Sequence, residues 1–356
     1  MSVQPREILL HITPQTRFDI IDVAARVREQ YRDVFTDYGK TLCCSFHTTA
    51  GYLDQPFCAA LGYSEKRLRQ FLLIFQKVFP PNAGYSHDCM RLRTELSESA
   101  KAHEPANGDS HLTFMSAGLQ NCVTYTNTAH WPIYFIDLDG LSTHSHRTRR
   151  TTLLLYNQAV VAYRGRFAIP TQTAHAIDAF NLRDPHYGLF AHLHTLIEYY
   201  SIAQGRIDIR LAPDERQVGL TVNEYEPMLM RNDFPEVLRD PLRYMVRRSK
   251  ELLRHPAAIS AKMREYTISD LIHLYNEVMD NVQIGRSLID RGLSFLSGPA
   301  SRLFRVKREI SLFISGSGEA GRGRIMQGTY QSPILIQSQQ AEKGVRGLEI
   351  TLWAFR

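Results

Sequence analysis

The chain has 356 residues, enough for two domains of ordinary size that each bury a core. A hydrophobic share of 44% and a charged share of 22% are typical of a globular protein and exclude a disordered or fibrous one. The net charge of +6 suits an anionic substrate without requiring nucleic acid. No apolar run approaches the roughly 18–20 residues of a membrane span, and the N-terminus lacks signal-peptide order, so we expect no membrane association.

The cysteines indicate a reducing compartment. There are five of them, an odd number, and none forms a CxxC pair: Cys43, Cys44, Cys58, Cys89 and Cys122. This pattern disfavours both a disulfide framework and a zinc–thiolate site. We therefore expect buried free thiols and a cytoplasmic location.

The first half alternates strand-like and helical segments. An extended start leads into apolar residues at helical spacing, and a strand-like run follows at 41–48. The pattern predicts a helix over 64–79, with Ser64 as its N-cap and Pro80 after its end. Polar loop sequence fills 82–110, and strand-rich sequence covers 133–140 and 151–163.

The second half reads in a similar order. A helical segment over 192–204 precedes strand-like runs at 205–212 and 218–224. A long helical segment then covers about 234–296, before three strand-like pieces at 307–316, 323–339 and 347–356. Aligning Ala50-Gly51 with Val218-Gly219 places Glu215 opposite His47. The repeated order indicates a tandem duplication, with one domain at 1–163 and a second at 164–356 that carries the 234–296 segment as an insertion.

Three histidines of the first half are candidate metal ligands. His47 ends a strand-like run, whereas His87 and His111 lie in polar loop sequence beside Asp88 and Asp109. Three imidazoles from separate elements could hold a divalent ion such as zinc and leave a position open for water or substrate. On this hypothesis, replacing His47 with alanine would abolish metal binding. The alternative is three unrelated histidines in loops.

The second half offers an acid/base candidate and two free cations. Asn223 and Glu224 follow an apolar run, where a glutamate could act as a general base, although a simple turn after a strand fits equally. The glycine-rich 316–324 stretch lacks the ending of a phosphate-binding P-loop, but Arg322 and Arg324 could meet an anionic ligand. The basic 239–254 stretch fits a solvated helix face, and no aromatic interleaving favours nucleic acid.

Taken together, these motifs resemble the YjbQ-like family, often labelled secondary thiamine-phosphate synthase. In the first half, HTTAG, YSHD and NGDSH match three family motifs in order. In the second half, VGLTVNE and GRIMQGTYQSPILIQ match the continuation of the first motif and the last motif. There are departures: the first half reads YLDQ where a glutamate is expected and TAHWP where GTWQG is expected, and the second half has no counterpart of the histidines.

The resemblance implies an α+β fold of two YjbQ-like domains, each an antiparallel sheet or sandwich with packed helices, and association into trimers or a pseudo-hexamer. It carries the family's metal-compatible histidine site onto His47, His87 and His111, and its Asn-Glu pair onto Asn223 and Glu224. We expect zinc as the ion, and Glu224, Asn223 and Asp109 as catalytic residues, with Glu224 or Asp109 as the acid/base group. Substrate contacts are expected from Thr48, Thr49, Thr329, Gln331, Arg322 and Arg324. The leading hypothesis is a transferase that acts on a phosphorylated small molecule, at a site completed across the interface between the two halves or between subunits. The alternative is a non-catalytic scaffold derived from the same fold.

Overall fold

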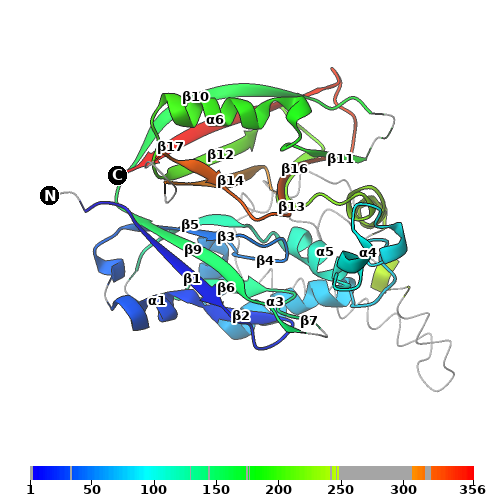
Figure 1. The fold of residues 1–356 in the computed structure, drawn as a ribbon, viewed down its shortest axis with the longest axis horizontal. Helices are drawn as coiled ribbons and strands as arrows, with labels where there is room; N and C mark the ends of the chain where they lie inside the picture. Colours follow the sequence, from blue (N-terminus) through cyan, green and yellow to red (C-terminus); the bar gives the residue numbers. More distant parts are fainter. Residues whose placement is uncertain are drawn as a thin grey trace.

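The structure is a computed structural model that describes residues 3–32, 34–128, 130–142, 145–173, 175, 177–240, 243–245, 247, 307–316 and 322–356. It is an α+β fold in which helices pack on antiparallel sheets (Figure 1). Most of the helical segment predicted at 234–296 lies outside the described residues, which retain α7 (Phe234–Arg239) at its start. No helix of the described residues is long and apolar enough to cross a membrane.

The N-terminal half, residues 3–156, contains two main sheets. The four-stranded sheet has the order β1-β9-β3-β5, and the three-stranded sheet has the order β2-β6-β4. The strands are β1 (Arg6–Ile12), β2 (Asp19–Asp22), β3 (Lys40–Ser45), β4 (Ala50–Gly51), β5 (Cys122–Thr126), β6 (Tyr134–Asp137) and β9 (Arg149–Tyr156), with a small β7 (Leu141–Ser142) and β8 (Ser145–His146) hairpin. The helices are α1 (Val23–Tyr31), α2 (Gln55–Ala60), α3 (Glu65–Val78), α4 (Glu98–Lys101) and α5 (Gly108–Ala117), with short 3₁₀ turns at Val34–Thr36 and Met90–Leu92.

The C-terminal half, residues 159–356, repeats this plan. Its sheets have the orders β10-β17-β12-β14-β15 and β11-β16-β13. The strands are β10 (Ala159–Pro170), β11 (Asp178–Asn181), β12 (Gly205–Leu211), β13 (Val218–Glu224), β14 (Glu309–Ser315), β15 (Arg324–Met326), β16 (Gln331–Gln337) and β17 (Val345–Phe355). A 3₁₀ turn at Pro185–Tyr187, α6 (Leu189–Tyr199) and a π-helical turn at Leu229–Asp233 complete it. The chain enters this second set of sheets at Ala159, a few residues before the predicted boundary at 163/164.

The two halves share strand order and register. The order β1-β9-β3-β5 of the larger N-terminal sheet corresponds to β10-β17-β12-β14 of the larger C-terminal sheet. The order β2-β6-β4 of the smaller N-terminal sheet corresponds to β11-β16-β13 of the smaller C-terminal sheet. In the smaller sheets, Gly51 pairs with Ile136 and Gly219 pairs with Ile336. The alignment of Ala50-Gly51 with Val218-Gly219 is therefore a structural correspondence as well as a sequence one.

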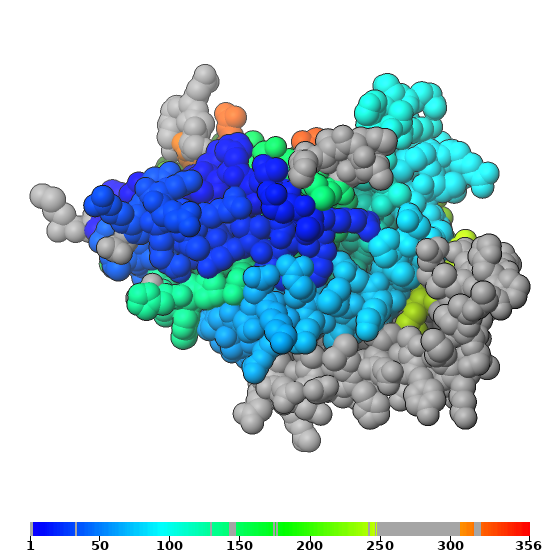
Figure 2. Space-filling view, turned by 90° about the horizontal axis from the view of Figure 1, so that it is seen from below, coloured from blue at the N-terminus to red at the C-terminus, as the bar shows by residue number. Residues whose placement is uncertain are grey.

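The halves meet through the faces of their larger sheets. In Figure 1 the sheet with β3 and β9 lies below the sheet with β12 and β17, and Figure 2 shows the N-terminal half (blue to cyan) over much of the lower face. Side chains of both sheets form one buried cluster, in which the rings of Tyr156 and Phe355 stack at 3.8 Å between centroids. Burial of these apolar side chains between the two larger sheets stabilises the contact between the halves.

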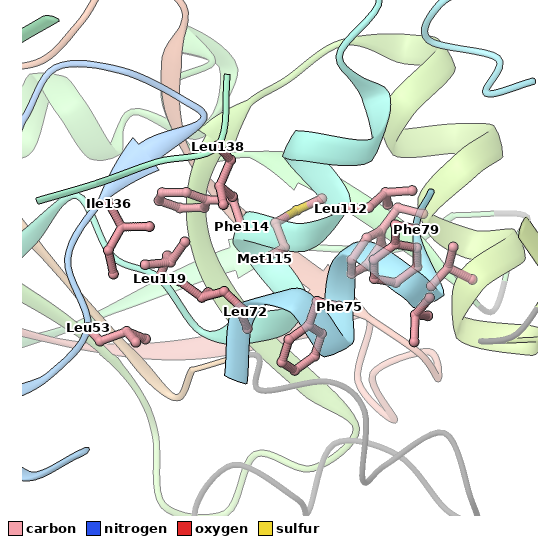
Figure 3. Close-up of a cluster of buried hydrophobic side chains, with 14 of the residues drawn as sticks. Leu53, Leu72, Phe75, Phe79, Leu112, Phe114, Met115, Leu119, Ile136 and Leu138 are labelled. Carbon is pink, nitrogen blue, oxygen red and sulfur yellow. The ribbon is translucent and has the colours of Figure 1, made fainter. Parts of the chain in front are cut away.

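A second core surrounds α5 and fixes its position. Every residue of α5 is buried, because α3 and the end of β6 cover it from one side while strands of the C-terminal half cover it from the other. Figure 3 shows Phe114 and Met115 of α5 among Phe75 of α3 and Leu138 after β6. A helix enclosed in this way holds its side chains in fixed positions, which matters for the site below.

Several sequence expectations are confirmed and three need correction. Helix α3 has Ser64 as its N-cap, whose side chain accepts the N–H of Arg67, and the predicted strand runs are strands. The 151–163 and 323–339 stretches, however, are each shared by two strands, since β9 ends before 157–158 and β10 follows, and a turn at 327–330 separates β15 from β16. His111 lies on α5 and not in a loop, because the polar start of NGDSH is the first turn of a buried helix that ends at Gly118 with φ of 74°.

Candidate functional site

The site is built around His111, whose ring has one nitrogen engaged and one free. Its Nδ1 lies 2.7 Å from Oδ1 of Asn223 on β13. That oxygen also accepts the N–H of Glu224, while Nδ2 of Asn223 donates to the carbonyl of Thr48, so Oδ1 is the amide's acceptor. Nδ1 of His111 must then carry the proton and donate it. The other nitrogen, Nε2, therefore presents a lone pair.

That lone pair has no hydrogen-bond donor. Nε2 of His111 is buried without a hydrogen-bond partner, and it lies 3.5 Å from Oε2 of Glu224. A buried polar atom without a partner is unusual in a folded protein. Burial lowers the pKa of His111 well below its usual value, and the positive charge of His87 adds to the effect. The imidazole is thus neutral, with its free nitrogen directed toward a carboxylate.

His87 is the second ring of the site and belongs to the loop after α3. Its ring centroid lies 4.9 Å from that of His111, and its side chain is fully buried. Nδ1 lies 3.0 Å from Oε2 of Glu226, and Nε2 lies 3.1 Å from Oδ1 of Asn107. Burial lowers the pKa of His87, but the hydrogen bond to Glu226 and the charge of Glu224 outweigh it, so the pKa is raised overall.

The C-terminal half also holds the backbone of the His87 loop. Both carboxylate oxygens of Asp233, in the π-helical turn, accept backbone N–H groups, one from Ser86 and one from His87, each at 2.8 Å. Asp233 also accepts the hydroxyl of Tyr244. The N-terminal half therefore supplies the His87 ring, and the C-terminal half fixes the backbone that positions it.

Glu224 is the point of access to the site. Its side chain is 14% exposed, whereas those of His87 and His111 are exposed by no more than 1%. Nη2 of the buried Arg93 donates to Oε1 of Glu224 at 3.1 Å and leaves Oε2 directed toward His111. Burial raises the pKa of Glu224, while the charges of His87 and Arg93 lower it by less.

The donor set is suited to a metal ion. Among the described residues, ligand atoms of His87, His111 and Glu224 all lie within 4.8 Å of one another. Two imidazoles and one carboxylate match the protein ligands of several catalytic zinc sites, and the same set can also bind iron. To bind an ion, His87 would have to lose a proton and give up one of its hydrogen bonds, to Glu226 or to Asn107. The free Nε2 of His111 fits such a role, because a ligating histidine commonly donates its other N–H to an oxygen acceptor, here Asn223.

His47 is not part of this group. Its Nε2 accepts the backbone N–H of Arg150 at 2.8 Å, and Nη1 of Arg149 lies 3.5 Å from its Nδ1. Burial, followed by the charges of Arg149 and Arg150, lowers the pKa of His47 to about 3. In the C-terminal half, Glu215 occupies the corresponding position and accepts the backbone N–H of Gly347. The position of His47 is thus used for turn structure in both halves.

Of the three predicted catalytic residues, two contact His111 and one does not. Asn223 and Glu224 contact His111, as described above. Asp109 lies two residues before His111 on α5 but forms an ion pair with Arg17, with Nη2 of Arg17 at 2.8 Å. Burial raises the pKa of Asp109 to about 6, against the opposing charge of Arg17. Its carboxylate is therefore engaged at a different point from Glu224.

The predicted substrate contacts have structural partners or lie at the surface. The carbonyls of Thr48 and Thr49 accept the amide of Asn223 and the N–H of Leu138. Nε2 of Gln331 donates to the carbonyls of Ser45 and His47, so it joins the two halves. Thr329, Arg322 and Arg324 are exposed, and Arg324 pairs with Ser315 in the β14–β15 ladder.

Three residues of the site are missing from the sequence prediction. Asn107 opens the NGDSH motif and Glu226 follows Glu224 by two residues, so proximity to the motifs was an available signal for both. Arg93 has no such signal, since it is one of several arginines in a polar stretch. Its importance follows from tertiary burial, which leaves its side chain 2% exposed between carboxylates.

Comparisons with known proteins return structural matches alone: no family model and no curated protein matches the chain. A hypothetical protein from Aeropyrum pernix K1 is 12% identical over 54% of this chain and 98% of that chain, with a TM-score of 0.27. A YbjQ-like protein of unknown function from Sulfolobus solfataricus P2 is 13% identical over 55% of this chain and 99% of that chain, at 0.28. An uncharacterized conserved protein of the yjbq/upf0047 family from Clostridium acetobutylicum is 17% identical over 41% and 97%, at 0.27. The α+β assignment rests on the chain's own strands and helices.

Proposed function

We propose that the chain is a metal-dependent enzyme that acts on a phosphorylated small molecule at the group formed by His87, His111 and Glu224. The observation that carries the proposal is the unpartnered Nε2 of His111, which lies 3.5 Å from Oε2 of Glu224. Leaving this atom unpaired costs the folded chain free energy, and a cation between the two atoms would remove that cost. Zinc is the ion we expect, and it would supply an activated water or polarise a phosphoryl oxygen.

The protein's own groups would orient the ligands and the substrate. Asn223 holds His111 with Nε2 unprotonated, and Arg93 holds Glu224 by its other oxygen. Arg93 and Arg147 are close enough that their charges lower the pKa of His111. Both guanidinium groups are paired with carboxylates, Arg93 with Glu224 and Glu226 and Arg147 with Asp139, so the phosphorylated substrate is proposed from the family resemblance and not from these charges. Glu224, the most exposed of the three, is the candidate to take up or release a proton.

We also propose that the chain arose by tandem duplication of a YjbQ-like unit. The support is the common strand order of the two halves, their common register and the shared role of His47 and Glu215. The thiamine-phosphate synthase reaction that the resemblance implies is one candidate reaction for the site. The scaffold alternative is less favoured, because two of the three predicted histidines converge with Glu224.

The first test measures metal content. The wild-type chain is purified without added chelator and its ions are counted by mass spectrometry, beside His111→Ala, Glu224→Gln and the control His194→Ala on the exposed side of α6. We expect about one ion per wild-type chain, retention in the control and loss in the two site variants. A wild-type chain that takes up no zinc or iron, even after dialysis against either ion, would refute the metal proposal.

The second test measures turnover. The ion-loaded chain is assayed against phosphate monoesters, with p-nitrophenyl phosphate as the probe, and against the hydroxymethylpyrimidine pyrophosphate and thiazole phosphate pair. Turnover that Glu224→Gln lowers and His194→Ala preserves supports an enzyme. Ion binding without turnover of any phosphorylated compound would instead favour the scaffold reading.

A further inference from the structure

The interface between the halves joins two different surfaces. From the C-terminal half, Asn223, Gly328 and Gln331 contact the turn at 45–48 of the N-terminal half. We name the first the gripping surface and the second the gripped turn. Because the halves correspond residue by residue, each also carries a counterpart of the surface that it does not use here. The unused gripping surface is Gln55, Thr128 and Trp131, and the unused gripped turn is 213–216.

The correspondence follows from strand register. Asp137 pairs with Asp19 and Ala50, just as Gln337 pairs with Asp178 and Val218. Counting back from these two positions places Thr128 opposite Gly328 and Trp131 opposite Gln331. Counting forward from Ala50 and Val218 places Gln55 opposite Asn223 in sequence, although Gln55 begins α2 whereas Asn223 lies within β13.

The unused gripping surface is blocked by a side chain. Gly328 packs so closely on the gripped turn that a Cβ there would lie 1.9 Å from the carbonyl oxygen of Phe46. Thr128 stands at the matching position and carries that Cβ. A turn therefore cannot approach Thr128 as closely as the 45–48 turn approaches Gly328.

The unused gripping surface has also lost its donors. Gln331 and Asn223 donate their amide N–H groups to carbonyls of the gripped turn. Gln55 instead forms hydrogen bonds within the N-terminal half: its Nε2 donates to the carbonyl of Thr126 and its Oε1 accepts the N–H of Thr126. Trp131 has no amide side chain, and its ring stacks on that of Tyr63 at 4.4 Å between centroids.

The unused gripped turn has its acceptors taken by nearby arginines. Nη1 of Arg216 donates to the carbonyls of Pro213 and Glu215. Arg308 donates to the carbonyls of Glu215 and Ala212, and Arg346 donates to that of Arg216. Guanidinium groups of the same half thus replace the amides that the other half supplies at 45–48.

We infer that the chain is a closed pair: the interface that builds the site is used once, within the chain, because neither leftover surface keeps the groups that form it. The unused gripping surface has Thr128 in place of Gly328 and an exposed Trp131 in place of Gln331, and the unused gripped turn has its carbonyls occupied by arginines. An interface between two different surfaces otherwise extends into a ring or a filament. Among the described residues, this interface therefore builds one composite site per chain and is not repeated between copies through these two surfaces. The trimer implied by the family resemblance is therefore not expected through these surfaces. This inference is independent of the proposed ion and reaction.

The test is sedimentation velocity on the full chain over a wide range of concentrations, for the wild type, Trp131→Glu and Arg216→Glu. We expect a concentration-independent monomer, or an association that both substitutions leave unchanged. An association of the wild type that either substitution disperses would overturn the inference. Trp131→Ala and Arg216→Gln serve as controls for folding. Cooperative thermal unfolding of each variant shows that the chain is still folded, so that a change in association reports on the lost contact.

Discussion

His47 and Glu215 perform the same task in the two halves, each accepting the backbone N–H of the residue that follows an arginine. His47 accepts from Arg150 after Arg149, and Glu215 accepts from Gly347 after Arg346. The arginine side chain lies against the same residue in both cases: Nη1 of Arg149 is 3.5 Å from Nδ1 of His47, and Nη1 of Arg346 donates to Oε2 of Glu215 at 2.7 Å. An imidazole and a carboxylate can exchange in this role because both accept hydrogen bonds.

This relationship predicts that His47→Ala affects stability and not the ion. The N–H of Arg150 would lose its acceptor, which should lower the free energy of unfolding by about 1 kcal/mol. Metal content should stay at the wild-type level, and His47→Gln should recover part of the lost stability because its amide oxygen can accept. Urea unfolding and ion counting on the same samples check both expectations. Loss of the ion in His47→Ala would return His47 to the ligand set.

The pH dependence of stability should also report on His47. Its folded pKa of about 3 lies below the unfolded value of 6.5, so the folded state favours the neutral ring. The unfolded chain then binds the extra proton first, and stability is lost as the pH falls below about 6.5 toward 3, by up to about 1.4 kcal/mol per pH unit. Above that window the ring is neutral in both states and contributes no pH dependence.

Comparison with His47→Gln isolates this contribution, because the other titrating groups are common to both chains. We expect the wild type to lose stability relative to the variant as the pH is lowered from 7 to 4, measured by urea unfolding at each pH. Parallel curves for the two chains would contradict the assignment of a low pKa to His47.

Asn223 should control ion affinity without contacting the ion. Its Oδ1 receives the N–H of His111 and so keeps Nε2 unprotonated. Removing the partner that orients a ligating histidine typically weakens metal binding by about 10–100-fold. We expect that loss for Asn223→Ala in a competition titration against a chelator, and no change for the surface control Asn157→Ala. Equal affinities for the two variants would count against His111 as a ligand.

The sequence predicts the elements of the site better than their arrangement. Strand and helix patterns are local, so β13 with its terminal Glu224 and α3 with its Ser64 cap follow from spacing alone. The burial of α5 is not local. Its polar first turn resembles a loop until strands of the other half cover it, and for that reason His111 was expected in a loop.

Of the three predicted histidines, His111 is the one with a ring nitrogen that lacks a hydrogen-bond partner, whereas both nitrogens of His87 are hydrogen-bonded. His47, His87 and His111 are alike in sequence, and only the packed structure distinguishes them. Nε2 of His47 is taken by a backbone N–H, whereas Nε2 of His111 has no hydrogen-bond partner. Arg93 shows the same limit, because two of the carboxylates that pair with it, Glu224 and Glu226, come from a segment more than a hundred residues away, and only Glu95 is near it in sequence.

Gly328→Ala should weaken the contact between the halves. The added Cβ would lie 1.9 Å from the carbonyl oxygen of Phe46, which belongs to backbone and cannot easily move. Forcing an atom into such a contact typically costs about 1–3 kcal/mol. The matched control is Gly39→Ala, whose Cβ would meet its nearest atom at 3.7 Å. Chemical unfolding should separate the two variants, and similar stabilities would show that the halves are not held at Gly328.

Arg93→Met should destabilise the chain in a way that zinc partly reverses. The buried guanidinium lies between Glu224 and Glu226, so its removal leaves Glu224 without its arginine partner and Glu226 with His87 alone. Breaking a buried ion pair from one side typically costs about 3–5 kcal/mol, and a divalent ion beside Glu224 would supply part of the missing charge. The exposed pair of Arg69 with Glu65 provides the control, since Arg69→Met should cost no more than about 1 kcal/mol. Unfolding measured with and without zinc should show a larger gain from the ion in Arg93→Met than in the wild type, and an equal gain in both chains would place the ion away from Glu224.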